Sequence, residues 1–158
     1  MSWSLAKDIS QLKFFFMLSV KEILKRKNND IFAASSDTTV YDAIKLMSEK
    51  NIGALPVVDG EQLSGIFSER DYARKIVLLN RKSQETLVKD IMTATVITVS
   101  PSDSIDDCME KMSAKRIRHL PVMQDGKLIG IISIGDVVTA IIESQKETIS
   151  HLQNYIAQ

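Results

Sequence analysis

Cysteine and histidine are scarce in this sequence, and neither charge is in excess. The one cysteine, Cys108, cannot form an intramolecular disulfide, which is typical of a reducing compartment, so we expect a cytoplasmic protein. With only two histidines, His119 and His151, no set of metal ligands has usable spacing, and no metal site is expected. Twenty basic residues balance twenty acidic ones, so no overall positive field attracts nucleic acid or an anionic membrane.

Long apolar runs are absent as well. The longest cluster near the N-terminus, residues 14–18, falls far short of the ~20 apolar residues that a membrane span needs. No cleavage site of small residues follows it, so secretion is not expected. Asp8 and the lack of arginine in the first 25 residues argue against a mitochondrial transit peptide, although a presequence-like helix remains an alternative. With 44% apolar and 25% charged residues, the composition is that of an ordinary globular protein.

The chain contains two copies of one sequence unit. Residues 31–71 align without a gap with residues 96–136, at an offset of 65. Upstream, residues 20–24 match residues 88–92 at an offset of 68, so the first copy has three extra residues around Asn28. Each unit of roughly 60 residues is too short to bury a good core alone. The two copies are therefore expected to pack against each other.

The periodicity within a copy changes in a fixed order. Residues 95–99 are a β-branched run typical of a strand, and capping residues follow them. Apolar residues at i, i+3, i+4 and i+7 then predict a helix face. These residues are Val40, Ala43, Ile44 and Met47 in one copy and Ile105, Cys108, Met109 and Met112 in the other.

The second half of each copy predicts a hairpin and another helix. Residues 119–123 and 128–133 are typical of two strands joined by a turn at Gly126. A helix then begins near Asp136, and its expected inner side consists of Val137, Val138, Ile141 and Ile142. The predicted fold class is α+β, with two pseudo-symmetric β-α-β-β-α units at residues 18–80 and 81–143. Helical extensions are expected at residues 1–17 and 144–158.

Three motifs occur in both copies, in the same order and at matching spacing: Val-Lys-Glu/Asp-Ile-Leu/Met, Leu-Pro-Val and Gly-Ile-x-Ser-x-x-Asp. Over about residues 18–143 the sequence therefore resembles the CBS (cystathionine-β-synthase) domain family, and the pair of copies resembles a Bateman module. It is similar to small stand-alone bacterial CBS-pair proteins. The resemblance implies a regulatory protein rather than an enzyme, with no required cofactor. It also implies a homodimer that signals to an unknown regulated protein.

The same resemblance implies an adenosine-containing ligand, such as AMP, ADP, ATP, NAD or S-adenosylmethionine, in clefts between the paired domains. The residues themselves support this chemistry. Ser68 and Asp71, like Ser133 and Asp136, are three apart at a strand-to-helix junction, where hydroxyl, carboxylate and free backbone N–H groups converge. The carboxylate can bind ribose hydroxyls, and the serine and helix N-terminus can bind phosphate. The alternative is that Asp71 and Asp136 are only N-caps, with the serines as turn residues.

Nearby cations and apolar residues complete the predicted sites. Arg70, Arg74, Arg118 and His119 are the cations expected to assist phosphate binding. The resemblance implies that adenine is flanked by Phe32 and Ile52 in the cleft closed by Asp136, and by Ile97 and Ile117 in the cleft closed by Asp71. Plain core packing is the alternative for these four residues. Because Arg118 and His119 replace Gly53 and Ala54 of the first copy, the two clefts are expected to differ.

Other functions and the two tails leave alternatives open. The competing functions are a nucleotide hydrolase that uses Asp71 or Asp136 and a structural interaction module with vestigial clefts.

Beyond the repeats, apolar residues at helical spacing need a surface to cover. They are Leu12, Phe15, Phe16 and Leu18 before the first copy and Ile149, Leu152 and Ile156 after the second. Docking within the chain and a homodimer explain these residues equally well.

Overall fold

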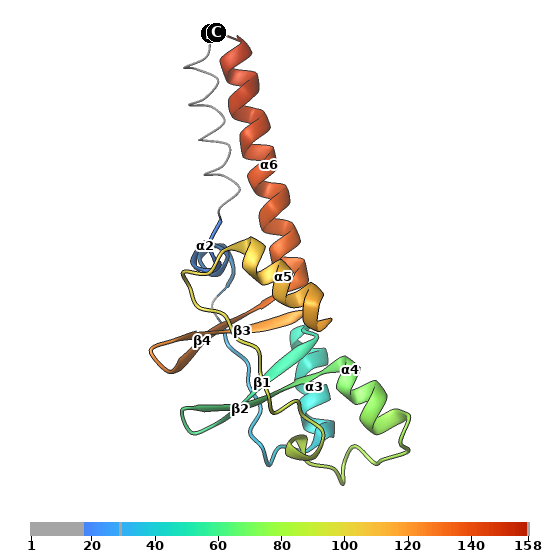
Figure 1. Ribbon diagram of the computed structural model, residues 1–158. Coiled ribbons are helices and arrows are strands. Elements are labelled where there is room, and N and C mark those ends of the chain that lie inside the picture. The colour runs from blue at the N-terminus through green and yellow to red at the C-terminus, as the bar shows by residue number, and fades with distance from the viewer. Residues whose placement is uncertain (1–17, 29, 158) are drawn as a thin grey trace. The chain divides into compact units, whose positions relative to one another are not determined.

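The computed structural model describes residues 18–28 and 30–157 (Figure 1), so the extension predicted at residues 1–17 lies outside the described residues. The described chain packs as two compact units. Unit 1 consists of residues 18–28, 99–120 and 132–157, and unit 2 of residues 30–98 and 121–131. Each unit therefore contains segments of both sequence copies. Among the described residues, no helix combines the length and apolar character required to cross a membrane.

Each copy contributes a helix, an antiparallel hairpin and a second helix. In chain order the elements are α2 (Val20–Arg26), α3 (Val40–Lys50), β1 (Ala54–Asp59), β2 (Gln62–Ser68), α4 (Glu69–Tyr72), the π-helix η1 (Ala73–Val77), the 3₁₀-helix η2 (Val88–Asp90), α5 (Ile105–Lys115), β3 (His119–Gln124), β4 (Lys127–Ser133) and α6 (Ile134–Ala157). Strand β1 pairs with β2, and β3 pairs with β4. The predicted α+β class with two related units is confirmed.

The strand predicted at residues 95–99 is not formed. The corresponding segment of the first copy pairs at a single point, where Ala34 lies parallel to Val57 of β1. There the Ala34 N–H donates to the Pro56 carbonyl at 3.0 Å, and the Val58 N–H donates to the Ala34 carbonyl at 2.8 Å. The segment before the helix of each copy thus contains a single bridge residue, Ala34 or Val99, rather than a strand, because the pairing does not continue to either side.

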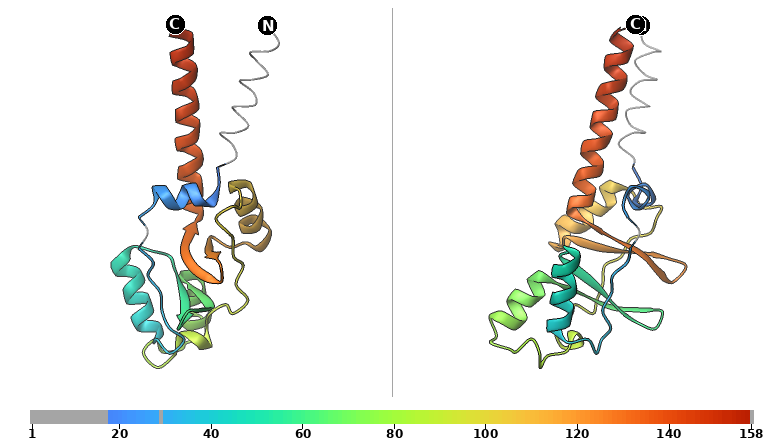
Figure 2. Two further views of the ribbon diagram at one scale, coloured as in Figure 1. Left: turned by 90° about the vertical axis from the view of Figure 1, so that its left-hand side faces the viewer. Right: turned by 180° about the vertical axis from the view of Figure 1, so that it is seen from behind.

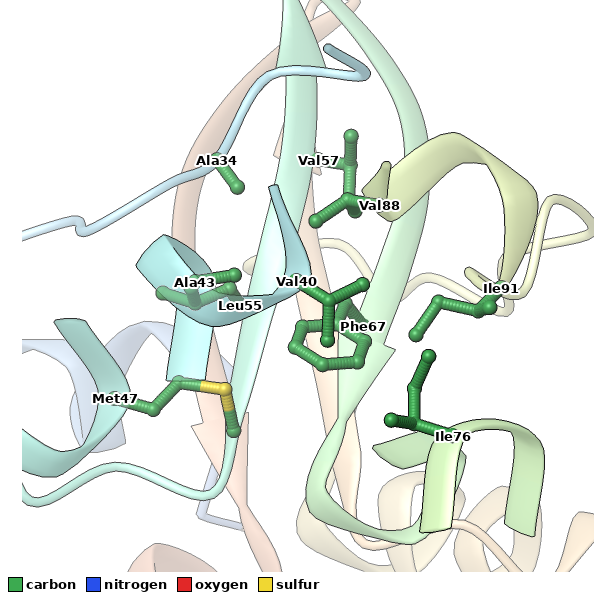
Figure 3. Close-up of a cluster of buried hydrophobic side chains, with 10 residues drawn as sticks. All are labelled: Ala34, Val40, Ala43, Met47, Leu55, Val57, Phe67, Ile76, Val88 and Ile91. Atoms are coloured by element: carbon green, nitrogen blue, oxygen red, sulfur yellow. The ribbon is translucent and has the colours of Figure 1, made fainter. Parts of the chain in front are cut away.

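The core of unit 2 is a cluster of buried apolar side chains around Phe67, which is fully buried (Figure 3). The helix α3 contributes its predicted stripe, while β1 and β2 contribute their inward-facing positions. The cluster consists of Ala34, Val40, Ala43, Met47, Leu55, Val57, Phe67, Ile76, Val88 and Ile91. Burial of this apolar surface fixes the end of β2 and the start of α4, where the first Ser-x-x-Asp motif lies.

Unit 1 is built on α2, α5 and α6. The Val20 N–H donates to the Asp103 carbonyl at 2.9 Å, and the Ile105 N–H donates to the Leu18 carbonyl at 2.9 Å, so α2 is fixed beside the start of α5. Cys108 is buried on α5, and burial raises the pKa of its thiol to about 11, further aided by the negative charge of Asp103. This thiol is therefore protonated at neutral pH and is a packing residue.

Gly65 lies on β2 where the chain segment around Met92 crosses the strand. Ile66 and Thr93 exchange two backbone hydrogen bonds, of 3.0 and 2.9 Å, at this crossing. A Cβ atom on Gly65 would lie 2.6 Å from the Met92 sulfur and 2.9 Å from the Thr93 carbonyl oxygen. Only glycine permits this close approach of two backbones.

We expect Gly65→Ala to lower the free energy of unfolding by about 1–3 kcal/mol, because the added methyl group forces the crossing segment away. Gly135→Ala is the matched control, since a Cβ atom there meets only the Ser133 hydroxyl oxygen at 3.6 Å. The control should change stability by no more than about 1 kcal/mol. Urea unfolding of both variants measures the difference, and equal stabilities would contradict the proposed close approach.

Candidate functional site

The first Ser-x-x-Asp motif forms a capping box in unit 2. The Asp71 N–H donates to the Ser68 hydroxyl oxygen at 3.2 Å, and the Ser68 N–H donates to Asp71 Oδ2 at 3.1 Å. Ser68 is thus the N-cap of α4 and Asp71 its third residue, the reverse of the roles in the cap-only alternative above. The box holds one carboxylate oxygen against the end of β2 and leaves the other, Oδ1, for a further partner.

That partner is Lys75, which the sequence analysis did not identify. Its Nζ lies 3.2 Å from Asp71 Oδ1 and donates to the Ile91 carbonyl at 2.8 Å. The spacing of four residues between Asp71 and Lys75 is a recognised signal for a helical ion pair, so this contact could have been predicted. Arg70 and Arg74, which were predicted, lie at exposed positions of the same helical segment.

The second motif forms the equivalent arrangement in unit 1. The Ser133 N–H donates to Asp136 Oδ2 at 2.8 Å, and the Asp136 N–H donates to the Ser133 hydroxyl at 3.1 Å. Lys27, from the three extra residues of the first copy, places its Nζ 2.8 Å from Asp136 Oδ2. The sequence analysis missed Lys27; the interruption of the repeat around Asn28 was the available signal.

Asp136 remains ionised despite its partial burial. Burial favours the neutral acid, but the hydrogen bond and charge of Lys27, together with the N–H and hydroxyl of Ser133, outweigh it and hold the pKa of Asp136 below its usual range. A fixed negative charge with a cation at hydrogen-bond distance therefore lies at the start of α6.

Arg118 and His119 lie in the same unit as Asp136, where the Arg118 carbonyl accepts from the Ile134 N–H at 2.8 Å. Burial lowers the pKa of His119, the charges of Lys27 and Arg118 lower it further, and the charge of Asp136 opposes them. The imidazole is therefore mostly neutral at pH 7 in the ligand-free chain, and its role as a cation beside phosphate stays a prediction. A neutral His119 can still donate or accept one hydrogen bond.

This lowered pKa predicts a pH dependence of stability. Between the folded pKa of His119 and its unfolded value of about 6.5, the unfolded chain binds more protons, so the free energy of unfolding should fall as the pH is lowered through this window. The change in the free energy of unfolding with pH should be smaller in His119→Gln than in the parent protein. It should be unchanged in His151→Gln, which alters an exposed position of α6. Urea unfolding at pH 5.5 and 7.5 measures it, and equal slopes in both variants would contradict the assignment.

The four residues predicted to flank adenine are partly buried. Phe32 and Ile52 pack against the core cluster of unit 2, and Lys50 Nζ lies 4.7 Å from the centroid of the Phe32 ring. Ile97 belongs to the same unit as Asp71. Ile117 belongs to unit 1, where its N–H donates to the Met112 carbonyl at 3.0 Å at the end of α5. Their role beside adenine stays a prediction.

Unit 2 also contains an open cavity of about 620 Å³. It is lined by Asp59, Glu61, Gln62, Leu63, Ala94, Val96, Thr98, Met123 and Gly126. None of the predicted ligand-binding residues lines this cavity, and its two carboxylates do not suit a phosphate. In residues 18–28 and 30–157, no cluster of His, Cys, Asp and Glu has the arrangement of a metal site.

Comparisons with known proteins identify relatives of the whole repeat. A family model described as "CBS domain" matches residues 20–78 and 88–143. The CBS domain-containing protein CBSX3, mitochondrial, of Arabidopsis thaliana is 42% identical over 151 residues, which cover 90% of this chain and 73% of that protein.

Two solved structures extend the comparison. One, of a protein with CBS domains from Burkholderia ambifaria, is 54% identical with a TM-score of 0.79 and covers 81% of this chain and 96% of that one. The other is the CBS domain pair of protein MJ0100 in complex with 5′-methylthioadenosine and S-adenosyl-L-methionine. It is 30% identical with a TM-score of 0.69 and covers 78% of this chain and 94% of that one.

Proposed function

Because the chain belongs to the CBS domain family, we propose that it is a stand-alone regulatory protein that binds adenosine-containing ligands and signals their occupancy to a partner. The main observation in favour of this proposal is that both copies contain a Ser-x-x-Asp capping box. Each box presents a carboxylate at the start of a helix. The structure of the MJ0100 pair, with two adenosine compounds bound, supports the ligand class.

The residues of each capping box suit the parts of a nucleotide. The Asp136 carboxylate accepts hydrogen bonds from the ribose hydroxyls, and charge-assisted bonds of this kind are the strong ones. Lys27, at 2.8 Å from that carboxylate, is long enough to exchange this contact for a phosphate oxygen, and Arg118 adds a second cation in the same unit. In the other copy, Asp71 and Lys75 take the same two roles. We therefore favour AMP, ADP, ATP or NAD over uncharged adenosine compounds as ligands.

The proposal includes a homodimer. The helical segments that follow the two motifs leave large apolar side chains in water at equivalent positions of the two copies. Val77 is 58% exposed, and its counterpart Ile142 is 47% exposed. An apolar surface that is repeated by the pseudo-symmetry suits a symmetric contact between two chains. The cytoplasmic location remains part of the proposal and rests on the single buried thiol of Cys108.

A thermal-shift screen with AMP, ATP, NAD and S-adenosylmethionine tests the function. A ligand that binds only the folded protein, at 100 times its dissociation constant, stabilises it by about 2.7 kcal/mol, which corresponds to an increase of several degrees in Tm. The same samples should contain unchanged ATP after incubation, since product formation would favour the hydrolase alternative. If no compound shifts the melting curve at millimolar concentration, the module with vestigial clefts is the better account.

A further inference from the structure

The C-terminal half of α6 extends beyond α2 and α5 in unit 1 (Figure 2). It carries an apolar stripe that no described residue covers. Ile149 is 54% exposed, Leu152 is 47% exposed and Ile156 is 81% exposed. These three residues are spaced by three and four positions, the spacing that places side chains along one seam of a helix.

This stripe is distinct from the face by which α6 packs on its own unit. The buried face consists of Val137, Ala140 and Ser144. At about 100° per residue, the exposed stripe is rotated by roughly a third of a turn from that face. The packing of α6 in unit 1 therefore does not account for the exposed stripe.

The first described residues belong to the same unit as α6. The Leu18 carbonyl and Ser19 pair with the start of α5. From α2, Arg26 forms ion pairs with α6, at 3.1 Å to Glu143 and 3.8 Å to Glu147. Leu18 is thus held at the start of α5, and the short helix α2 that follows it connects this point to α6 within unit 1.

The 17 residues before Leu18 have the length and the pattern to cover the stripe. As a helix they would span about 25 Å, and residues 144–157 of α6 span about 20 Å. Leu5, Ile9, Leu12 and Phe16 are spaced by four, three and four positions, which is the spacing of a matching apolar seam. Neither seam contains a charged residue.

We propose that residues 1–17 dock as an amphipathic helix on the exposed stripe of α6 in the same chain. Since α6 leads away from unit 1 and residues 1–17 lead toward it, the two helices run antiparallel. The stripe is then covered by a segment of the same chain. A partner protein that binds the stripe or residues 1–17 would compete with this intramolecular contact.

Amide hydrogen exchange on the full chain tests the docking. In the parent protein, the amides of residues 5–16 should be protected. Leu152→Glu should accelerate their exchange at least tenfold, whereas Asn154→Glu, at an exposed position on the other side of α6, should not. Amides of residues 134–144 report whether α6 stays folded in each variant. Unprotected residues 5–16 in the parent, or protection that survives Leu152→Glu, would overturn the proposal.

A cross-linking measurement separates this occupant from a second copy. The double variant Leu12→Cys/Ile149→Cys, treated with a short bis-maleimide, should give a linked product of monomer mass on a denaturing gel. Cys108 is buried, so it does not compete for the reagent. A product of dimer mass would assign the stripe to a second chain, and this product, or the absence of any linked product, contradicts the proposal.

Discussion

Asp136→Ala is expected to remove one class of binding sites for AMP or ATP, and Asp71→Ala the other. Each substitution removes the acceptor of two ribose hydroxyls, and hydrogen bonds to charged groups contribute about 1.5–3 kcal/mol each. The affinity of the affected site should therefore fall by about a hundredfold or more. Isothermal titration calorimetry of the parent protein should show two unequal classes of sites, and each variant should show one.

The chain offers a matched control for the loss of the helix cap. Asp107 forms the same capping box with Ser104 at the start of α5, with its N–H 3.1 Å from the Ser104 hydroxyl, but it belongs to neither proposed site. Asp107→Ala should lower stability by about 0.5–2 kcal/mol and leave both binding classes intact. If it weakens binding as much as Asp136→Ala does, the carboxylates act only as caps.

Arg118→Ala distinguishes the contribution of phosphate contacts to the binding affinity from that of ribose contacts, and the same calorimetric titration measures it. Its lost donor is proposed to face phosphate alone, so the affinity for AMP should fall about tenfold or more while the affinity for adenosine stays unchanged. An equal loss for the two ligands would mean that Arg118 acts through the fold rather than on phosphate.

Phe67→Ala is expected to have the largest effect on stability. Phe67 is fully buried at the centre of the unit 2 cluster, where Figure 3 shows its ring among Val40, Ile76 and Ile91. Removing a buried phenylalanine ring usually costs about 3–5 kcal/mol, from lost burial and from the cavity left behind. Leu79→Ala, at a side chain that is 59% exposed, should change the free energy of unfolding by less than about 1 kcal/mol. Urea midpoints measure both, and similar values for the two variants would contradict the core assignment.

The sequence predicted the architecture because the chain repeats itself. The duplicated motifs predicted two copies of one arrangement of helices and strands, and period 3.6 located α3, where Val40, Ala43 and Met47 are buried. They did not predict that each compact unit combines segments of both copies. The width of the apolar faces was harder to predict. Met109, Val138 and Ile142 were assigned to inner faces, yet they are 41%, 45% and 47% exposed. When a helix has more apolar residues on one face than its neighbours cover, the sequence does not show which of these residues are buried.

The site was predicted only where its contacts are local. Ser68 with Asp71 and Ser133 with Asp136 are three residues apart, so helix geometry alone brings them together. Lys27 contacts Asp136 across 109 residues of sequence. That contact depends on how α2 packs against α6, which no periodicity in a single sequence encodes. The neutral state of His119 likewise depends on burial that only the folded chain reveals.

Native mass spectrometry of the freshly purified protein tests the central claim most directly, because it reports bound nucleotide and the number of chains together. We predict a homodimer that carries, or takes up on addition of AMP or ATP, one adenosine compound for each occupied Ser-x-x-Asp site. The Asp71→Ala/Asp136→Ala double variant should carry none. A parent protein that stays at its ligand-free mass in millimolar AMP and ATP, or a double variant that binds as the parent does, would contradict the account.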